Sequence, residues 1–462
     1  MKAYLRLASL FGVAALLTVG AARQAAAQAA VTDYYVDYNT GVDAAGNGAP
    51  GNPGSQAAPW KTFDFGYHQV PATGGFTVHV GAGIYQGNSN GSGFQQIDRQ
   101  FSSLVVITTT SGVQDVVIQG YSDLVSNVRQ WGDLSNTQFQ NIKFTPRAGT
   151  LYGFEPHLGV NATNMSFDNC LFEAGDAANS FAFICSPSSN VRTHDWTLTN
   201  CSFTHVNVGA GNSFTFGTAP NQTATVRLIN CTGTSAGAGL WLDGANLNVI
   251  IQGGYYTNNG TAKVCVLIGA DGAIGSGQGV TGSVTNATII SYNSHALEGG
   301  DNSHNLLFSG NIVQGADHSI ALKNSRNATV QNNSVFSGTL SGIILKGGSG
   351  NLIANNTVTA RQGFGIANVD SGHYIVTNST VRDNYIVVDG GTGMNWDMST
   401  DGGGNSVDYT TFEFRQGYLA NVGGVTNITT LSGITAAWMN YTVTQNDSHD
   451  ILIMNTKGHG RR

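Results

Sequence analysis

Short runs in which apolar and polar residues alternate recur along most of this chain. Thr329-Val330-Gln331 and Gly342-Ile343-Ile344-Leu345 are typical of these runs. A period of two residues is the pattern of a β-strand, and none of the runs has the period of a helix. Glycine and asparagine separate the runs, and both residues favour tight or left-handed turns. The pattern therefore predicts an all-β protein of short strands.

The runs belong to a repeat. Each unit contains a short apolar run, then Asn, Gly or Asp, then one further residue, as in Leu228-Ile229-Asn230-Cys231. Repeats of 20 to 50 residues indicate a stacked architecture, and three short strands per unit predict a parallel β-helix. At about 27 residues per unit, residues 76–400 make about 10–12 coils. The final positions are Cys170, Cys201, Cys231, Gly254, Ala287, Asn311, Asn333, Asn356 and Asn384.

These final positions form one column when the units are stacked. The column holds Cys, Gly or Ala in the early units and Asn in the later ones. Stacked amides at an inward turn can hydrogen-bond along the column, so that no buried amide is left unpaired. We therefore expect an asparagine ladder in the later coils.

Composition excludes several classes of protein. Of the 462 residues 62 are Gly and 8 are Pro, 10% are charged and 41% are hydrophobic. A coiled coil needs more charged residues, a disordered chain has fewer apolar ones, and collagen needs more proline. The net charge is -7 and Lys and Arg form no cluster, so we expect no nucleic-acid partner. The five cysteines favour repeat positions over a disulfide framework, because three of them fall in the column.

The N-terminus has the pattern of a secretory signal. Lys2 and Arg6 precede an apolar stretch over 7–22, and Ala27-Gln28-Ala29 fits a cleavage site. We expect cleavage near Ala29 and a mature chain in a bacterial periplasm or outside the cell. No other apolar stretch is long enough to span a bilayer. We expect a monomer.

Segments near both ends of the mature chain carry a resemblance to known proteins. They are Tyr34-Tyr35-Val36-Asp37, Gly41, Asp43, Pro59-Trp60-Lys61-Thr62, residues 76–85, Trp438 and Asp447-Ser448-His449. On these segments the chain resembles right-handed parallel β-helix proteins of the pectate-lyase-like superfamily. The resemblance implies a single-stranded right-handed β-helix. It implies little about activity, because the superfamily holds lyases, hydrolases, epimerases and proteins without known activity.

We expect four segments along the chain. They are a signal peptide over 1–29, an N-terminal strand and cap loop over 30–75, the β-helix over 76–400 and a C-terminal capping segment over 401–462. Capping is expected because open coil ends expose apolar core and unpaired strand edges.

One outward column stands out because charge is scarce in this chain. Aligning the strands by their leucines predicts an inward stack of Leu242, Leu267, Leu297, Leu322 and Leu345. The next residue of each strand then points outward, and these residues are Asp243, Ile268, Glu298, Lys323 and Lys346. Rungs stack at roughly 4.8 Å, so Glu298, Lys323 and Lys346 become consecutive neighbours.

Adjacent lysines suit β-elimination of a uronate-containing polysaccharide. The reaction needs a base for the C5 proton and positive charge beside the carboxylate. Lys323 is the expected base, Lys346 the expected neutraliser, and Glu298 tunes them or binds a cation. The segments Leu322-Lys323-Asn324-Ser325 and Leu345-Lys346-Gly347 resemble the alginate lyase and chondroitinase B family, which has a Lys and an Arg on neighbouring coils. Here Lys346 stands in the Arg position, and Glu298 and Asp301 only roughly match the acidic calcium cluster of that family.

Three alternatives stay open. The column can be a structural ladder with a salt bridge from Glu298 to Lys323. An inverting glycoside hydrolase can use Asp243 and Glu298, two rungs or roughly 9–10 Å apart, near the 6.5–9.5 Å such enzymes use. The protein can also be a non-catalytic cell-envelope or glycan-binding β-helix.

Further residues near the column are candidates for substrate binding. Trp241 is expected outward with Val266, Ala296, Ala321 and Ile344, where it can stack on a sugar ring. His318 can titrate near neutral pH, whereas the parity of the strand places His295 in the core. The turns overhanging the same edge contribute Asp301, Asn324 and Arg326.

The loop over 37–60 is the candidate for a cofactor. Its Asp, Asn and Gly residues can hold Ca²⁺, and the alternative is a turn-rich cap over the first coil. No zinc spacing, Ser-His-Asp motif, phosphate-binding loop or dinucleotide fingerprint occurs in the sequence.

Overall fold

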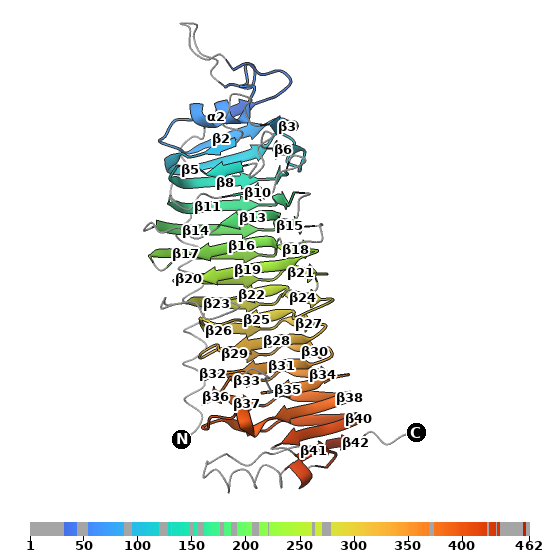
Figure 1. Cartoon of the computed structure of the whole chain (residues 1–462). Coiled ribbons are helices and arrows are strands. Elements are labelled where there is room, and N and C mark those ends of the chain that lie inside the picture. Colours follow the sequence, from blue (N-terminus) through green and yellow to red (C-terminus); the bar gives the residue numbers. More distant parts are fainter. Residues whose placement is uncertain are drawn as a thin grey trace, which may run out of the picture.

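The computed structural model is a single right-handed parallel β-helix, in which short strands stack coil upon coil (Figure 1). This confirms the fold class. The structure describes residues 32–43, 54–86, 95–119, 128–130, 132–146, 152–155, 161–175, 180–185, 192–205, 212–219, 221–260, 264–269, 279–368, 374–422, 425–430, 432–434 and 456–458. The expected signal peptide, residues 44–53 of the loop and the segment around 438–449 lie outside these residues.

The first stack of strands runs the length of the helix. It contains fourteen strands in register, all paired in parallel. The strands are β1 (Thr32–Val36), β2 (Phe76–Val80), β5 (Gln100–Thr109), β8 (Leu134–Gln140), β11 (Ala162–Asp168), β14 (Arg192–Thr199), β17 (Gln222–Ile229), β20 (Leu247–Gln252), β23 (Val280–Thr285), β26 (Ser303–Ser309), β29 (Thr329–Gln331), β33 (Leu352–Ala354), β37 (Thr380–Arg382) and β39 (Ser406–Asp408).

The second stack follows the first around a tight turn. Its strands are β3 (Gly83–Gln86), β6 (Val116–Gln119), β9 (Ile142–Phe144), β12 (Leu171–Glu173), β15 (Ser202–His205), β18 (Thr232–Ser235), β21 (Tyr255–Asn258), β24 (Thr288–Ser291), β27 (Ile312–Gln314), β30 (Ser334–Phe336), β34 (Thr357–Ala360) and the first halves of β38 (Tyr385–Trp396) and β40 (Thr411–Val422).

The third stack completes each coil and carries the candidate site. Its strands are β10 (Tyr152–Phe154), β13 (Phe181–Cys185), β16 (Asn212–Thr218), β19 (Ala238–Gly244), β22 (Val266–Ile268), β25 (Leu297–Gly299), β28 (His318–Lys323), β31 (Ser341–Lys346), β35 (Phe364–Ala367) and the second halves of β38 and β40. Two small parallel pairs lie outside the stacks: β4 (Gln95–Ile97) with β7 (Val128–Gln130), and β32 (Gly348–Ser349) with β36 (Val376–Thr377). Two further strands pair with β40, β41 (Val425–Ile428) in antiparallel and β42 (Thr456–Gly458) in parallel.

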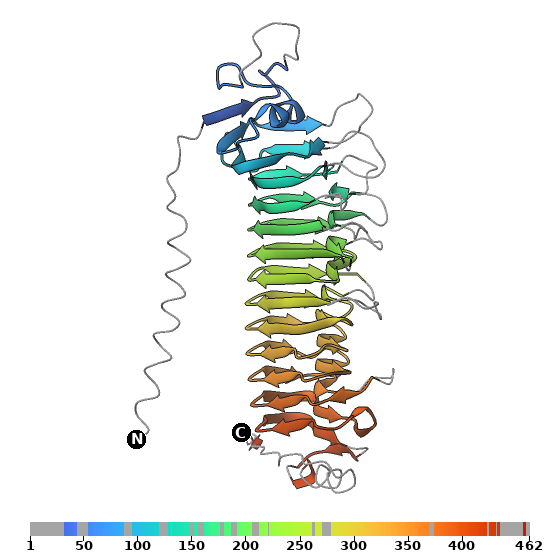
Figure 2. The same cartoon turned by 90° about the vertical axis from the view of Figure 1, so that its left-hand side faces the viewer.

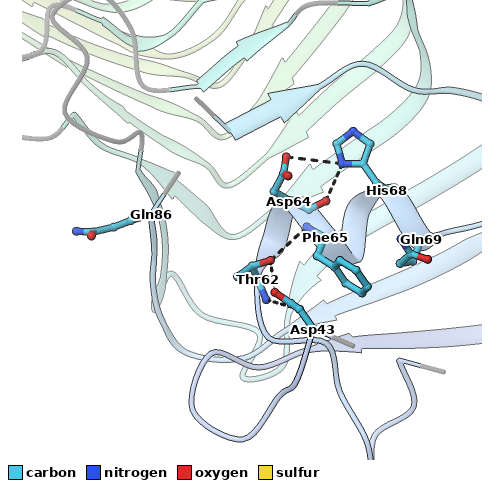
Figure 3. A pocket seen from close by; sticks show the side chains of 7 residues that line it. All are labelled: Asp43, Thr62, Asp64, Phe65, His68, Gln69 and Gln86. Carbon is cyan, nitrogen blue, oxygen red and sulfur yellow. Dashed lines mark hydrogen bonds and ion pairs between the residues drawn. The ribbon is translucent and has the colours of Figure 1, made fainter. Parts of the chain in front are cut away.

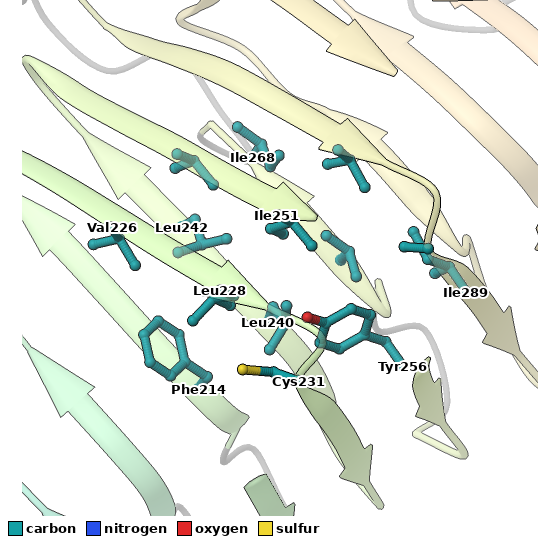
Figure 4. Packing of buried hydrophobic residues seen from close by; sticks show 14 of the residues in the cluster. Phe214, Val226, Leu228, Cys231, Leu240, Leu242, Ile251, Tyr256, Ile268 and Ile289 are labelled. Carbon is teal, nitrogen blue, oxygen red and sulfur yellow. The ribbon is translucent and has the colours of Figure 1, made fainter. Parts of the chain in front are cut away.

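The interior of the coils is filled by columns of like side chains. In the N-terminal coils Phe139, Phe167 and Trp196 stack face to face, with ring centroids 5.2 and 5.9 Å apart. Towards the C-terminus the columns become aliphatic, and Figure 4 shows Leu242 and Ile268 pointing into this core. Each rung buries its apolar side chains against those of the next rung, so stability is shared along the whole stack.

The predicted asparagine ladder is present at the turn between the first and second stacks. Asn311, Asn333, Asn356 and Asn384 are each 1% exposed. The side-chain oxygen of Asn333 accepts hydrogen bonds from the backbone and side-chain nitrogens of Asn311 at 2.9 and 3.0 Å. Asn333 makes the same two contacts to Asn356, and Asn356 makes them to Asn384. The residue before each ladder position adopts a positive φ, as Asn332 does at 57°, which closes the turn.

The cysteines in the early part of the same column are unpaired thiols. Cys170, Cys201 and Cys231 are buried, and so are Cys185 and Cys265. The Cys201 thiol lies against the backbone oxygens of Phe167 and Thr199, and burial raises its pKa. The interpretation of the cysteines as repeat residues is confirmed.

The N-terminal end of the helix is covered by α2 (Phe63–Gln69), which begins at the N-cap residue Thr62. Tyr67 of α2 is fully buried and packs edge to face against Phe101. Figure 2 shows the cap at one end of the column of coils. At the other end β39 and β40 continue the stacks past residue 400, beside the short 3-10 helix η1 (Met398–Thr400). No helix in the described parts of the chain is long and apolar enough to cross a bilayer.

Replacing one amide inside the ladder tests how far the coils depend on it. Asn333→Ala removes four buried hydrogen bonds and leaves the Asn311 backbone N–H without its acceptor. Unpaired buried groups cost about 1–3 kcal/mol each, so we expect a loss of about 3 kcal/mol or more in unfolding free energy. Urea denaturation followed by circular dichroism measures this loss. The exposed Gln314→Ala on β27 is the control and should change stability by less than about 0.5 kcal/mol; equal effects of the two substitutions would refute a special role of the ladder.

Candidate functional site

Lys323 and Lys346 lie at the same position of consecutive rungs. They are paired in register at the ends of β28 and β31, as expected. Their neighbours Leu322 and Leu345 point into the core, so both lysines point outward. The rung spacing places their backbones roughly 4.8 Å apart.

The predicted column is wrong in the two strands between Leu242 and Leu322, by one residue in β22 and by two residues in β25. Leu242 pairs with Ile268, and Ile268 pairs with Gly299, so Leu267 and Leu297 do not belong to the Leu242 stack. A shift of one residue moves a side chain to the other face of a strand. Ile268 is therefore a core residue, as Figure 4 shows, and not part of the outward column.

Glu298 occupies a different outward column from the lysines. It pairs with Leu267 on one side and with Ala321 on the other, so it does not neighbour Lys323 in register. The predicted salt bridge from Glu298 to Lys323 is also wrong. Lys323 forms an ion pair with Asp301, whose side-chain oxygen lies 3.5 Å from the lysine nitrogen.

The true register also separates the two carboxylates of the hydrolase hypothesis. Trp241, not Asp243, shares the column of Glu298, together with Thr215, Leu267, Ala321 and Ile344. The expected neighbours Val266 and Ala296 are not in it. Two rungs plus two residues along the strand place the Cα atoms of Asp243 and Glu298 roughly 11–12 Å apart. Inverting glycosidases hold the carboxyl groups themselves roughly 6.5–9.5 Å apart, and the offset of two residues along the strand moves Asp243 and Glu298 further apart than the predicted column did.

Asp243 and Trp241 form a separate group three rungs from Lys323. Both are partly buried on the outer face of β19. Burial raises the pKa of Asp243, and hydrogen bonds from the Gly244 backbone and the Trp241 side chain oppose the rise. Trp241 lies roughly 14 Å from the lysine rung along the third stack.

Asp301 contacts both Lys323 and the residue that follows it, Asn324. The Asn324 side chain donates to Asp301 at 2.5 Å, and Asp301 is only 6% exposed. Asn324 adopts a positive φ of 51°, which ends β28 and turns the chain back toward Asp301. The structure therefore brings Lys323, Asp301 and Asn324 together, as the sequence suggested.

Arg326 lies one turn beyond this group. Its backbone bridges His304 and Ser349 on neighbouring rungs, and the residue is exposed. It borders the same edge of the third stack.

Two histidines behave differently from their predictions. His295, expected in the core, is partly exposed and hydrogen-bonds through Nδ1 to a Glu298 oxygen at 2.9 Å. His318, expected to titrate near neutral pH, is 4% exposed, and its pKa is lowered to about 2 by burial and by the charges of His295 and Lys346. The two rings pack edge to face with centroids 4.7 Å apart.

The His295–Glu298 pair and the Lys323–Asp301 pair were both missed from the sequence. The spacing of three residues between His295 and Glu298 was a signal for the first pair. It was missed because the alternation of the strand was extended to His295, which precedes the first residue of β25.

The loop over 37–60 uses its described carboxylates to hold turns. An Asp37 oxygen accepts from the backbones of Asn39 and Thr40, and Asp43 accepts from the backbone and hydroxyl of Thr62. This favours the turn-rich cap over a calcium loop for the part of it that is described.

A hollow with a volume of about 540 Å³ lies beside the cap (Figure 3). His68 borders it and links α2 to the coil, because Nδ1 contacts the Asp64 backbone oxygen and Nε2 lies 2.8 Å from Asp98. The hydrogen bond to Asp98 raises the pKa of His68, and the same bond lowers the pKa of Asp98. The lining residues are Asp43, Thr62, Asp64, Phe65, His68, Gln69 and Gln86.

Comparison with known proteins gives one family match and several fold matches. Residues 278–412, under a third of the chain, match the family described as periplasmic copper-binding protein (NosD). No curated protein matches the sequence. The described residues contain no group of three or more His, Cys, Asp or Glu side chains that could hold a metal ion, so they do not fit a copper site.

Among solved structures the chain is similar to tailspike protein 3 of bacteriophage CBA120, at 13% identity and a TM-score of 0.49, covering 84% of this chain and 59% of the tailspike. It is also similar to the A-module of the mannuronan C-5 epimerase AlgE4 of Azotobacter vinelandii, at 13% identity and a TM-score of 0.44, covering 83% and 91%. Pectate lyase Pel9A is similar at 16% identity and a TM-score of 0.42, covering 80% of each chain. This chain therefore spans less than two thirds of the tailspike.

The link between His68 and Asp98 predicts a pH-dependent cap. Because the pKa of His68 is raised in the folded protein, its stabilisation is full below pH about 6.5 and is lost as pH rises through the folded pKa. We expect His68→Gln to lower the melting temperature more at pH 5.5 than at pH 9. Thermal denaturation at both pH values measures this, and an equal loss at both would contradict the ionic link.

Proposed function

We propose that this protein is an exported, carbohydrate-active β-helix protein that binds an acidic glycan along the third stack and cleaves it by β-elimination. The observation that carries the proposal is the registered pair of Lys323 and Lys346 on the outer face of β28 and β31. Export is supported by the basic and apolar N-terminal pattern and by the match of residues 278–412 to a family described as periplasmic.

The lysine pair concentrates positive charge in a chain whose net charge is -7. Asp301 forms an ion pair with Lys323, and within the described residues Lys346 has no ion-pair partner. Two ammonium groups stand on adjacent rungs, and Asp301 pairs with one of them. Such a site favours a uronate carboxylate, and it does so on a rigid platform that needs little reorganisation.

β-Elimination requires this neutralisation, because the C5 proton becomes acidic only when the adjacent carboxylate charge is offset. The ion pair between Lys323 and Asp301 suits Lys323 to charge neutralisation alongside Lys346 better than to the role of base. Trp241, three rungs away, supports binding of a chain of several sugar units, since aromatic rings stack on sugar faces. The hydrolase alternative has weaker support because the register separates Asp243 from Glu298.

The assay is incubation with alginate, pectate and glycosaminoglycans, followed by the ultraviolet absorbance of unsaturated uronates. We expect activity on at least one acidic glycan and a fall of about 100-fold or more in kcat/KM for Lys323→Gln and for Lys346→Gln. Lys143→Gln on β9, on the second stack, is the matched control and should retain full activity.

Absorbance that never rises with any acidic glycan would refute the lyase. Reducing ends released without absorbance would favour a hydrolase, and binding without turnover would favour a non-catalytic glycan-binding protein.

A further inference from the structure

Glu298 is a carboxylate placed in an otherwise apolar part of the outer surface. Its column neighbours on either side are Leu267 and Ala321, and it is 3% exposed. Ala321 and Ile344 belong to a small apolar cluster separate from the helix core, which confirms that this side of the strand faces outward. A buried carboxylate is costly unless it is paired, so its partner matters.

The partner is His295, whose Nδ1 lies 2.9 Å from a Glu298 oxygen. This contact fixes the tautomer of a neutral His295, because Nδ1 must carry the hydrogen that the carboxylate accepts. The Nε2 atom then holds the free electron pair. The side chain of His295 is 20% exposed while that of Glu298 is 4% exposed, so the imidazole is the member of the pair that reaches solvent.

His318 restricts the imidazole from the next rung. Its ring packs edge to face on His295, and its buried Nδ1 has no hydrogen-bond partner among the described residues. The remaining charged groups nearby are Lys346, whose charge acts on His318, and Asp317, which precedes His318 and accepts from the Thr339 hydroxyl at 3.5 Å. Burial disfavours the charged form of His318 by lowering its pKa, and His295 is the more exposed imidazole of the two.

Glu298, which contacts His295, lies on the same outer face of the third stack as the lysine pair. Glu298 is in register with Ala321, and Ala321 lies two residues before Lys323 on the same face of β28. Two residues along a strand span roughly 7 Å. The carboxylate that contacts His295 therefore lies on the same outer face as the lysines, and His295 meets it from the residues that precede β25.

We propose that His295, oriented by Glu298, is the general base of the site, acting on a uronate whose carboxylate is held by Lys323 and Lys346. The proposal rests on the proposed function. Nε2 of His295 takes the C5 proton, the C5–H electron pair forms the C4–C5 double bond, and the C4–O4 bond breaks. The departing oxygen keeps that bonding pair and takes a proton from water. Glu298 is a positioning residue, because it acts through His295.

Kinetics of variants test the assignment. We expect His295→Ala to lower kcat by about 100-fold or more with little change in KM, and added imidazole to restore part of the rate. Glu298→Gln should keep the fold but change the pH–rate profile, because the group that contacts the imidazole has lost its charge. A merely structural role for either residue would produce neither the rescue nor the shifted profile.

His79→Gln is the matched control. His79 also contacts a carboxylate, that of Asp33 at 3.2 Å, but it lies in the first coil far from β25. It should leave the pH–rate profile unchanged. Circular dichroism of each variant checks the fold. If His295→Ala is less stable, rescue by added imidazole still tests the role of the side chain, because an unfolded protein cannot be rescued in this way.

The outcomes separate this inference from the proposed function. Full activity of His295→Ala, together with loss of activity in Lys323→Gln and Lys346→Gln, would overturn the base assignment and leave the lyase intact. Wild-type protein that yields no unsaturated product from any acidic glycan would overturn the lyase and the base with it.

Discussion

The structure depends on the parallel backbone ladder that lays each coil directly on the previous one at roughly 4.8 Å. Under this constraint every side chain packs against the side chain at the same position of the next coil. A column is therefore stable only if side chains of the same type can pack against one another. Aromatic rings stack on rings in the early coils, and aliphatic side chains pack on aliphatic ones later. Asparagine is the polar residue that meets the same requirement, because its amide can donate to one neighbour and accept from the other.

The same stacking also brings the side chains of outward columns close together. Identical charges on adjacent rungs repel, so the lysine rung of Lys323 and Lys346 is tolerated only with compensation from a group such as Asp301. A glycan chain laid across such rungs can meet positive charge, a tryptophan and a histidine without any movement of the scaffold. Rigidity of this kind suits electrostatic stabilisation, which depends on groups already fixed in place.

The sequence predicted those features that repeat and failed where the repeat signal is weak. The turn column was predictable because Asn, Gly or Asp marks nearly every unit, and the lysine register followed from the clear pattern of Ile320-Ala321-Leu322 and Ile343-Ile344-Leu345. The strand Val266-Leu267-Ile268 is apolar at every position, so alternation could not decide which side chains face inward. The resulting misalignment placed Glu298 in the lysine column, two residues from its true partner Ala321. His295 precedes the first residue of β25, so the alternation of that strand does not decide where it points. Asp301 was expected at this edge, but its pairing with Lys323 depends on a turn whose geometry no strand pattern encodes.

The corrected position of Glu298 changes the chemical argument more than it changes the fold. In the predicted column Glu298 was one charge among others on an exposed ladder, and a salt bridge explained it. In the true column it is a buried carboxylate between Leu267 and Ala321, where leucine or alanine would pack at lower cost. A coil built only for stability does not need a carboxylate there. Its single described hydrogen bond reaches His295, the partly exposed histidine, and so the burial of Glu298 is explained most simply by the orientation it imposes on that imidazole.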